Sequence, residues 1–119
     1  MKIFSNMHYK VVIQLNSSDY SVHKSMLDQI SNLLLDLDDI DVKVVVHGNA
    51  YPFLLKNSFF QLHIEDLQKR NVHFYLCENT MDNQNLIQKD MLEGVKTVTS
   101  GVAYLVKKQS NGWAYLKAG

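Results

Sequence analysis

The sequence contains very little cysteine and proline, with one residue of each in 119. A single cysteine, Cys77, cannot form a disulfide within the chain, which excludes a small secreted domain held together by disulfides. It also fits the reducing cytoplasm, so we expect a cytoplasmic location. A chain of this length can bury a hydrophobic core without disulfides or bound metal, so we expect a single domain over residues 1–119.

The chain also lacks an excess of charge and any long apolar run. It has 12 Lys and Arg against 12 Asp and Glu, so its formal net charge is zero. Because no basic surplus is available to neutralise a run of phosphates, we expect no nucleic-acid partner. No apolar window approaches the roughly 20 residues of a membrane-spanning helix. The opening MKIFSNMHYKVV lacks the apolar stretch of a signal peptide, so we expect no membrane partner.

The sequence does contain an alternation of two hydrophobic patterns. Short β-branched and aromatic runs predict buried strands over residues 9–15, 42–47, 72–77, 95–98 and 113–117. The segments between them predict helices over 22–37, 86–92 and 102–109, and two short helices within 52–69. Ser100 is the expected N-cap of the last helix. This alternation is typical of an α/β domain with a mostly parallel, five-stranded sheet and helices on both faces.

Polar residues follow four of the predicted strands. Right-handed crossovers bring the carboxyl ends of parallel strands to one edge of the sheet, and ligands of open α/β sheets bind at that edge. We therefore expect a site there, with Cys77 open to solvent in a polar crevice. The candidate residues are Ser17, His47, Cys77, Asn79, Thr80, Ser100 and Gly101.

Cys77 is the candidate for chemistry at this edge. A helix N-terminus or a nearby cation lowers the pKa of a thiol and increases the fraction that is the nucleophilic thiolate. His47, at the end of the neighbouring strand, is the candidate partner base. Glu78 acts in the opposite direction, because a like charge disfavours the thiolate. A second interpretation stays open, since unpaired cysteines are mostly buried and pack as small hydrophobic side chains.

Other kinds of site have little support in the sequence. The five histidines include no His-x-x-x-His pair, and no cysteine lies at ligand spacing from a histidine on a loop, so we predict no metal. Gly48 and Gly101 compose neither a G-x-G-x-x-G motif nor a phosphate-binding loop. We therefore predict no nucleotide cofactor.

Sequence motifs spread over most of the chain point to a known family. They are LNSSD after the first strand, VVVHGNA on the second, VHFYLCENTM around Cys77, and GVKTVTSGVAYLVKKQSNGWAYLKAG at the end. Together they resemble the DsrE/DsrF-like family, in particular its small YchN-like branch. The resemblance implies a three-layer α/β/α domain that assembles as a homotrimer or homohexamer. Its better-studied members act in cytoplasmic sulfur relay, where a cysteine carries sulfane sulfur as a persulfide. By position, that cysteine is Cys77.

Two functions follow from these observations. The first is a sulfur-relay or sulfurtransferase-like protein that carries persulfide sulfur on Cys77, with a sulfur-donor or acceptor protein as partner. One cysteine suffices, because the partner supplies the second thiol. The alternative is a non-catalytic oligomeric binding module with a small-ligand or partner site at the same edge. Glu78 and the absence of a basic residue from TMDNQN favour this alternative.

Overall fold

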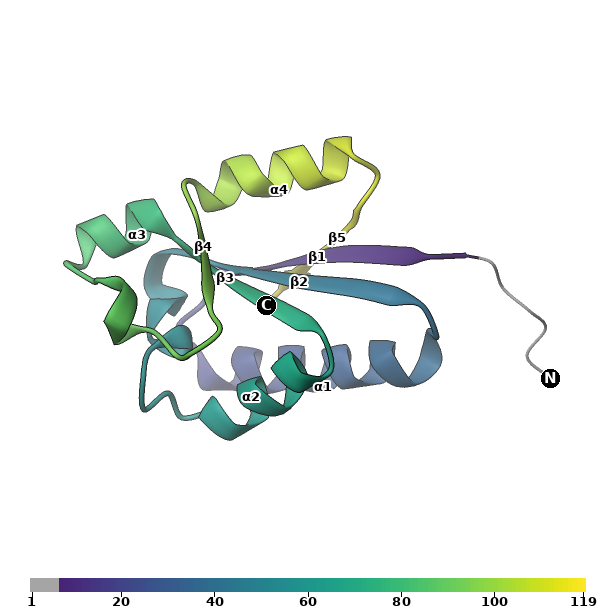
Figure 1. Cartoon of the computed structure of the whole chain (residues 1–119), viewed down its shortest axis with the longest axis horizontal. Coiled ribbons are helices and arrows are strands. Elements are labelled where there is room, and N and C mark those ends of the chain that lie inside the picture. The colour runs from purple at the N-terminus through teal and green to yellow at the C-terminus, as the bar shows by residue number, and fades with distance from the viewer. Residues whose placement is uncertain (1–6) are drawn as a thin grey trace.

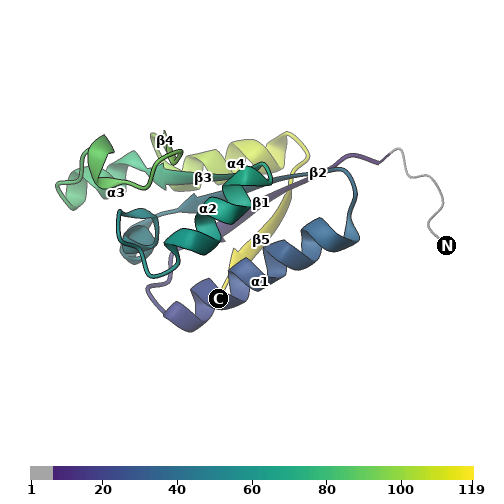
Figure 2. The same cartoon turned by 60° about the horizontal axis from the view of Figure 1, so that its bottom comes forward.

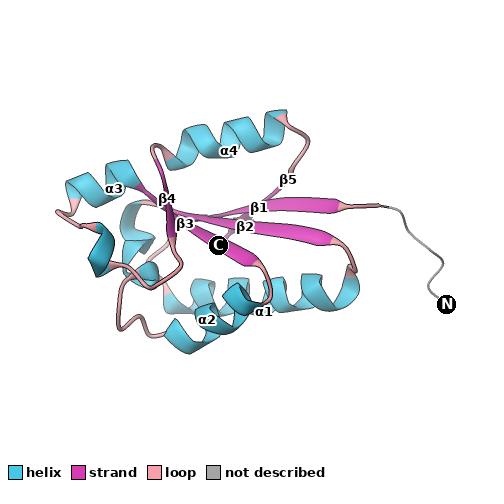
Figure 3. Ribbon diagram, in the orientation of Figure 1, coloured by secondary structure: helices cyan, strands magenta, loops and turns pink. Residues whose placement is uncertain are grey.

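A computed structural model describes residues 7–119, in which a central sheet lies between helices (Figures 1 and 3). Residues 1–6 of the predicted domain lie outside this described part. The strands are β1 (Tyr9–Leu15), β2 (Ile40–Val46), β3 (Val72–Cys77), β4 (Lys96–Val98) and β5 (Ala114–Ala118). The helices are α1 (Tyr20–Asp36), α2 (Gln61–Lys69), α3 (Glu78–Asn83) and α4 (Gly101–Ser110), and the 3-10 segments are η1 (Gly48–Leu54) and η2 (Gln88–Asp90). None of the helices in the described part is long and apolar enough to cross a membrane.

All five strands run parallel, in the order β4-β3-β2-β1-β5. From β1 to β4 the chain steps in one direction across the sheet, and it then returns to the far side of β1 for β5. Right-handed crossovers therefore place α1 and α2 on one face and α4 on the other. Figure 1 shows α4 above the sheet with α1 and α2 below it, and Figure 2 shows the same division from another side. The predicted α/β fold class and its three layers are confirmed.

The two faces of the sheet differ in the amount of apolar core that they hold. The face toward α1 and α2 carries the main core, to which Leu27 and Ile30 of α1 contribute fully buried side chains. The face toward α4 carries a much smaller buried cluster of Val12, Val45 and Leu105. Polar side chains can therefore lie on the α4 face without interrupting the main core.

Side-chain caps mark the start of two of the four described α-helices, α1 and α4. Asp19 caps α1, and its carboxylate accepts a hydrogen bond from the Ser21 N–H at 2.8 Å. Ser100 caps α4 as predicted, and its hydroxyl accepts a hydrogen bond from the Ala103 N–H at 3.2 Å. The two short helices predicted before β3 are present as η1 and α2, although η1 begins earlier than predicted.

The segment after Cys77 differs from the prediction. No helix is predicted over residues 78–85, but α3 begins directly at Glu78, with Cys77 as its N-cap. Thr80 and Met81 are buried, so contacts with the rest of the domain stabilise a helix too short and too polar to show an apolar stripe. The helix predicted over 86–92 is only the single 3-10 turn of η2.

Replacing Leu27 with alanine should strongly destabilise the fold. Leu27 is 0% exposed, so the truncation leaves a cavity in the main core and should cost about 2–5 kcal/mol of unfolding free energy. Leu62→Ala on α2 is the matched control, because Leu62 is 82% exposed and its loss should cost less than about 0.5 kcal/mol. Urea unfolding measures both changes. Equal losses would contradict the assigned buried face of α1.

Candidate functional site

Cys77 is the last residue of β3 and lies on the sheet face toward α4. The backbone N–H of Gly101, the first residue of α4, donates a hydrogen bond to Cys77 Sγ at 3.3 Å. Cys77 is only 6% exposed, so the expectation of a thiol open to solvent is wrong. The thiol is buried because the N-terminus of α4 packs directly against the end of β3.

The close contact at Gly101 depends on the absence of a side chain. A β-carbon at this position would lie 3.3 Å from His47 Cβ, 3.3 Å from Val45 Cγ1 and 3.5 Å from Cys77 Cβ. The first two distances are shorter than ordinary van der Waals contact, so glycine allows α4 to approach the sheet more closely than another residue would. The contact also makes three predicted site residues, His47, Cys77 and Gly101, direct neighbours.

Hydrogen bonds stabilise the thiolate form of Cys77. Burial alone raises the pKa of this thiol, because a buried charge loses its hydration. The backbone N–H groups of Thr80, Gly101 and Asn79 and the Thr80 hydroxyl act against burial, and the net pKa lies below the ordinary value for cysteine. The Thr80 hydroxyl oxygen accepts a hydrogen bond from the Gly48 N–H at 2.9 Å, which leaves its own hydrogen for the sulfur.

His47 follows β2 beside Cys77, but among the described residues no hydrogen bond joins their side chains. Gln14 Nε2 instead donates to His47 Nε2 at 2.9 Å, and the Tyr115 hydroxyl donates to Gln14 Oε1. This network assigns the imidazole hydrogen to Nδ1. Burial lowers the pKa of His47, so the ring is neutral at neutral pH. His47 therefore ends a polar chain of side chains that crosses the α4 face from β5 to β2.

A polar pocket of about 490 Å³ lies at the β4 edge of the site. Glu78, Thr97, Ser100 and Lys107 are among the residues that line it. The Glu78 carboxylate accepts a hydrogen bond from the Thr97 hydroxyl at 2.7 Å, and Glu78 is not among the main groups that shift the pKa of Cys77. Lys107 brings a cation to the pocket wall from α4, whereas α3, which follows Cys77 directly, contains no Lys or Arg.

Ser17 lies apart from the other predicted site residues. Its hydroxyl accepts a hydrogen bond from the Asp19 N–H at 3.1 Å, and its carbonyl accepts one from His23 Nε2 at 2.6 Å. These contacts hold Ser17 at the start of α1, on the side of the sheet opposite α4. The remaining predicted residues gather around the thiol or line the pocket beside it. Within residues 7–119, no group of three His, Cys, Asp or Glu side chains is placed to hold a metal ion.

Sequence reasoning missed two residues of the hydrogen-bonded chain that ends at His47, Gln14 and Tyr115, and one residue of the neighbouring pocket, Lys107. Gln14 interrupts the apolar run YKVVIQL. Because a polar side chain inside a buried strand needs a hydrogen-bond partner, this position could have identified Gln14 as part of a polar contact. Lys107 lies two helical turns after Ser100, which places both on one side of α4. No local signal in the sequence marks Tyr115, because its contact with Gln14 depends on the pairing of β5 with β1.

The fold and the site define a class of protein. It is an α/β protein with a parallel five-stranded sheet and one thiol held between the N-termini of two helices, at the carboxyl end of a strand. The sequence model of the DsrE/DsrF-like family matches residues 9–118, which is nearly the whole chain. The chain therefore belongs to the DsrE/DsrF-like family.

Several solved structures share this fold. The chain is similar to MTH1491, a protein of unknown function from Methanobacterium thermoautotrophicum, with 31% identity over 92% of this chain and 98% of that one and a TM-score of 0.90. The E. coli ychN protein shares the fold at 18% identity, with coverage of 93% and 99% and a TM-score of 0.73. So does BT1422, a conserved protein of unknown function from Bacteroides thetaiotaomicron, at 15% identity, with coverage of 91% and 93% and a TM-score of 0.74. No curated protein matches the chain.

Replacing Thr80 with valine should raise the pKa of Cys77. The substitution keeps the shape of the side chain and removes one hydrogen-bond donor to the thiolate, which disfavours the charged form. Because Cys77 is the only cysteine, the pH dependence of alkylation by iodoacetamide reports its pKa directly. We expect the midpoint of this profile to move to higher pH and the rate at neutral pH to fall.

Thr99→Val is the matched control for this experiment. Thr99 lines the neighbouring pocket but is not among the main groups that shift the pKa of Cys77. Its substitution should leave the midpoint unchanged. A midpoint that Thr80→Val does not raise would show that this hydroxyl does not stabilise the thiolate.

Proposed function

We propose that the protein is a sulfur carrier in which Cys77 holds sulfane sulfur as a persulfide. The observation that carries the proposal is the group of hydrogen-bond donors around one buried thiol, which lowers its pKa. In persulfide exchange, the carrier cysteine is a thiolate twice, first as the nucleophile and then as the leaving group. Donors that stabilise the thiolate therefore support both steps.

The exchange consists of two balanced substitutions at sulfur. In the first, the Cys77 thiolate attacks the outer sulfur of a donor persulfide. A new S–S bond forms, the donor's S–S bond breaks, and its electron pair leaves on the donor thiolate. In the second, an acceptor thiolate attacks the outer sulfur now held on Cys77, and the Cys77 thiolate is released. The sulfane sulfur changes partner without net oxidation, so no second cysteine in this chain is needed.

The pocket at the β4 edge offers the acceptor a route to the site. Its lining includes Glu78 and Ser100, which are the sequence neighbours of Cys77 and Gly101. Lys107 in the same wall supplies a cation that attracts an approaching thiolate. The low exposure of Cys77 shields a bound persulfide from bulk solvent between the two steps.

The alternative function is a non-catalytic binding module that uses the same edge of the sheet. The observation that favours it is the burial of Cys77 beside a pocket whose wall already carries both charges, Glu78 and Lys107. Such a module would hold a small polar ligand or a partner segment in the pocket, and Cys77 would then serve as a packed side chain.

The proposed carrier works as a homo-oligomer, a trimer or a hexamer, in the cytoplasm. Large apolar side chains remain exposed on the surface, including Leu35, Val106 and Leu116. Leu35 and Leu116 line the same groove of about 750 Å³ between α1 and β5. Contiguous exposed apolar surface is typical of a protein interface. The donor and acceptor of sulfur would be partner proteins, and a lone reduced thiol suits a cytoplasmic location.

Incubation with inorganic polysulfide should load one sulfur atom onto the protein. Mass spectrometry of the intact chain should show a gain of one sulfur mass, and a reducing thiol should remove it. Cys77→Ser should abolish the gain, whereas Thr99→Val should keep it. The binding-module alternative predicts no adduct on the folded wild-type chain, so that result would overturn the carrier proposal.

Sedimentation of the wild-type chain at micromolar concentration should show a trimer or a hexamer. Because the proposed contact buries apolar side chains and the net charge is zero, raising the salt concentration should not dissociate it. A monomer under these conditions would contradict the proposed assembly and would leave the carrier chemistry to be judged from the polysulfide experiment.

A further inference from the structure

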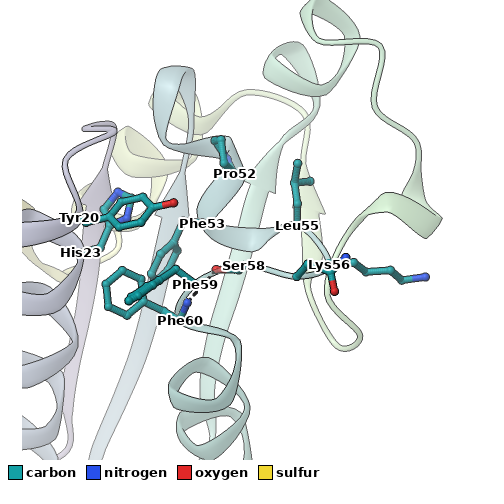
Figure 4. Close-up of a pocket in the computed structure, with 10 residues that line it drawn as sticks. Tyr20, His23, Pro52, Phe53, Leu55, Lys56, Ser58, Phe59 and Phe60 are labelled. Carbon is teal, nitrogen blue, oxygen red and sulfur yellow. Dashed lines mark hydrogen bonds between the residues drawn. The ribbon is translucent and has the colours of Figure 1, made fainter.

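A second cavity lies on the opposite face of the sheet from Cys77, between α1 and the segment after η1 (Figure 4). Its volume is about 190 Å³. Five rings line it, those of Tyr20, His23, Phe53, Phe59 and Phe60. Figure 4 shows these side chains pointing toward one another, whereas the ammonium group of Lys56 points away from them. The cavity is therefore aromatic, and no charge is directed into it from Lys56.

The rings form an exposed outer wall and a buried inner wall. On the outside, Tyr20 and Phe59 stack with their centroids 5.3 Å apart, although the two residues are 57% and 67% exposed. On the inside, His23 and Phe53 meet edge to face at 4.9 Å. Tyr20 also stacks over His23 at 5.8 Å. Because the outer rings are exposed, they can turn aside without disrupting the main core.

His23, which belongs to this inner wall, has a ring nitrogen without a hydrogen-bond partner among the described residues. The residue is only 2% exposed, and its Nε2 donates to the Ser17 carbonyl at 2.6 Å. The ring hydrogen is therefore on Nε2, and Nδ1 carries a lone pair. Among the described residues, no donor reaches His23 Nδ1, which is itself buried. Buried polar atoms almost always have a hydrogen-bond partner, and for this nitrogen the partner would be a water molecule or a bound ligand.

We propose that this cavity binds a small, neutral, planar molecule with one aromatic ring and one O–H or N–H group. Tyr20, which stacks over His23, turns aside, so that the ring of the ligand stacks against Phe59 and its O–H or N–H group donates a hydrogen bond to His23 Nδ1. The size limits the ligand, because an apolar cavity of about 150 Å³ accommodates benzene, and sites for drug-sized molecules begin at about 300 Å³.

Phenol and toluene test the proposal as a matched pair, because they have the same shape and differ in one O–H group. Each is titrated into protein with ¹⁵N-labelled histidine. Phenol should bind saturably and shift the Nδ1 resonance of His23, since that nitrogen becomes a hydrogen-bond acceptor. Toluene should bind about tenfold more weakly and leave the Nδ1 resonance in place.

Two substitutions of exposed residues test whether phenol binds in this cavity or on other apolar surface. Phe59→Ala removes part of the outer wall and should weaken phenol binding. Leu62→Ala is the matched control, because Leu62 is 82% exposed and does not line the cavity, and it should leave binding unchanged. Cys77→Ser should also leave it unchanged, which keeps this result independent of the proposed sulfur chemistry.

Three results would overturn the proposal. One is the absence of saturable phenol binding at millimolar concentration. Another is equal binding of phenol and toluene with an unmoved His23 resonance. The third is phenol binding that Phe59→Ala does not weaken.

Discussion

The contact between α4 and the sheet at Gly101 is the constraint on which the site depends. Because no side chain separates the helix from the strand ends, the first N–H of α4 reaches Cys77 Sγ. The same contact removes the thiol from solvent. Burial alone would raise the pKa of the thiol, and the donors of α4 and of Thr80 reverse that effect. The same packing contact thus removes the thiol from solvent and supplies a donor that lowers its pKa.

The direction of the chain across the sheet places the main apolar core and the polar hydrogen-bonded chain on opposite faces. The steps from β1 to β4 place α1 and α2 on one face, which holds the main core. The return to β5 places α4 alone on the other face, where Gln14, His47 and Tyr115 form a hydrogen-bonded chain across the strands. The main-core face is not wholly apolar either, since among the described residues the buried His23 Nδ1 has no hydrogen-bond partner there.

Much of the fold could be predicted because its signals are local. Continuous apolar runs mark the buried parallel strands, and apolar residues three and four apart mark α1 and α4. The helix α3 could not be predicted, because it is stabilised by the burial of Thr80 and Met81 against distant parts of the chain. For the site, topology correctly brought His47 and Gly101 to Cys77. It failed for Ser17, because the chain after β1 turns toward the α1 face.

The sequence by itself determined the α/β class, the family, and a lone thiol at the carboxyl end of a strand. The tertiary structure alone decided that this thiol is buried and hydrogen-bonded, that His47 is held by Gln14, and that within residues 7–119 His23 Nδ1 has no partner. The reason is physical. Hydrophobic periodicity and turn residues act between near neighbours in the chain, whereas burial, pKa and hydrogen-bond pairing depend on residues that only folding brings into contact.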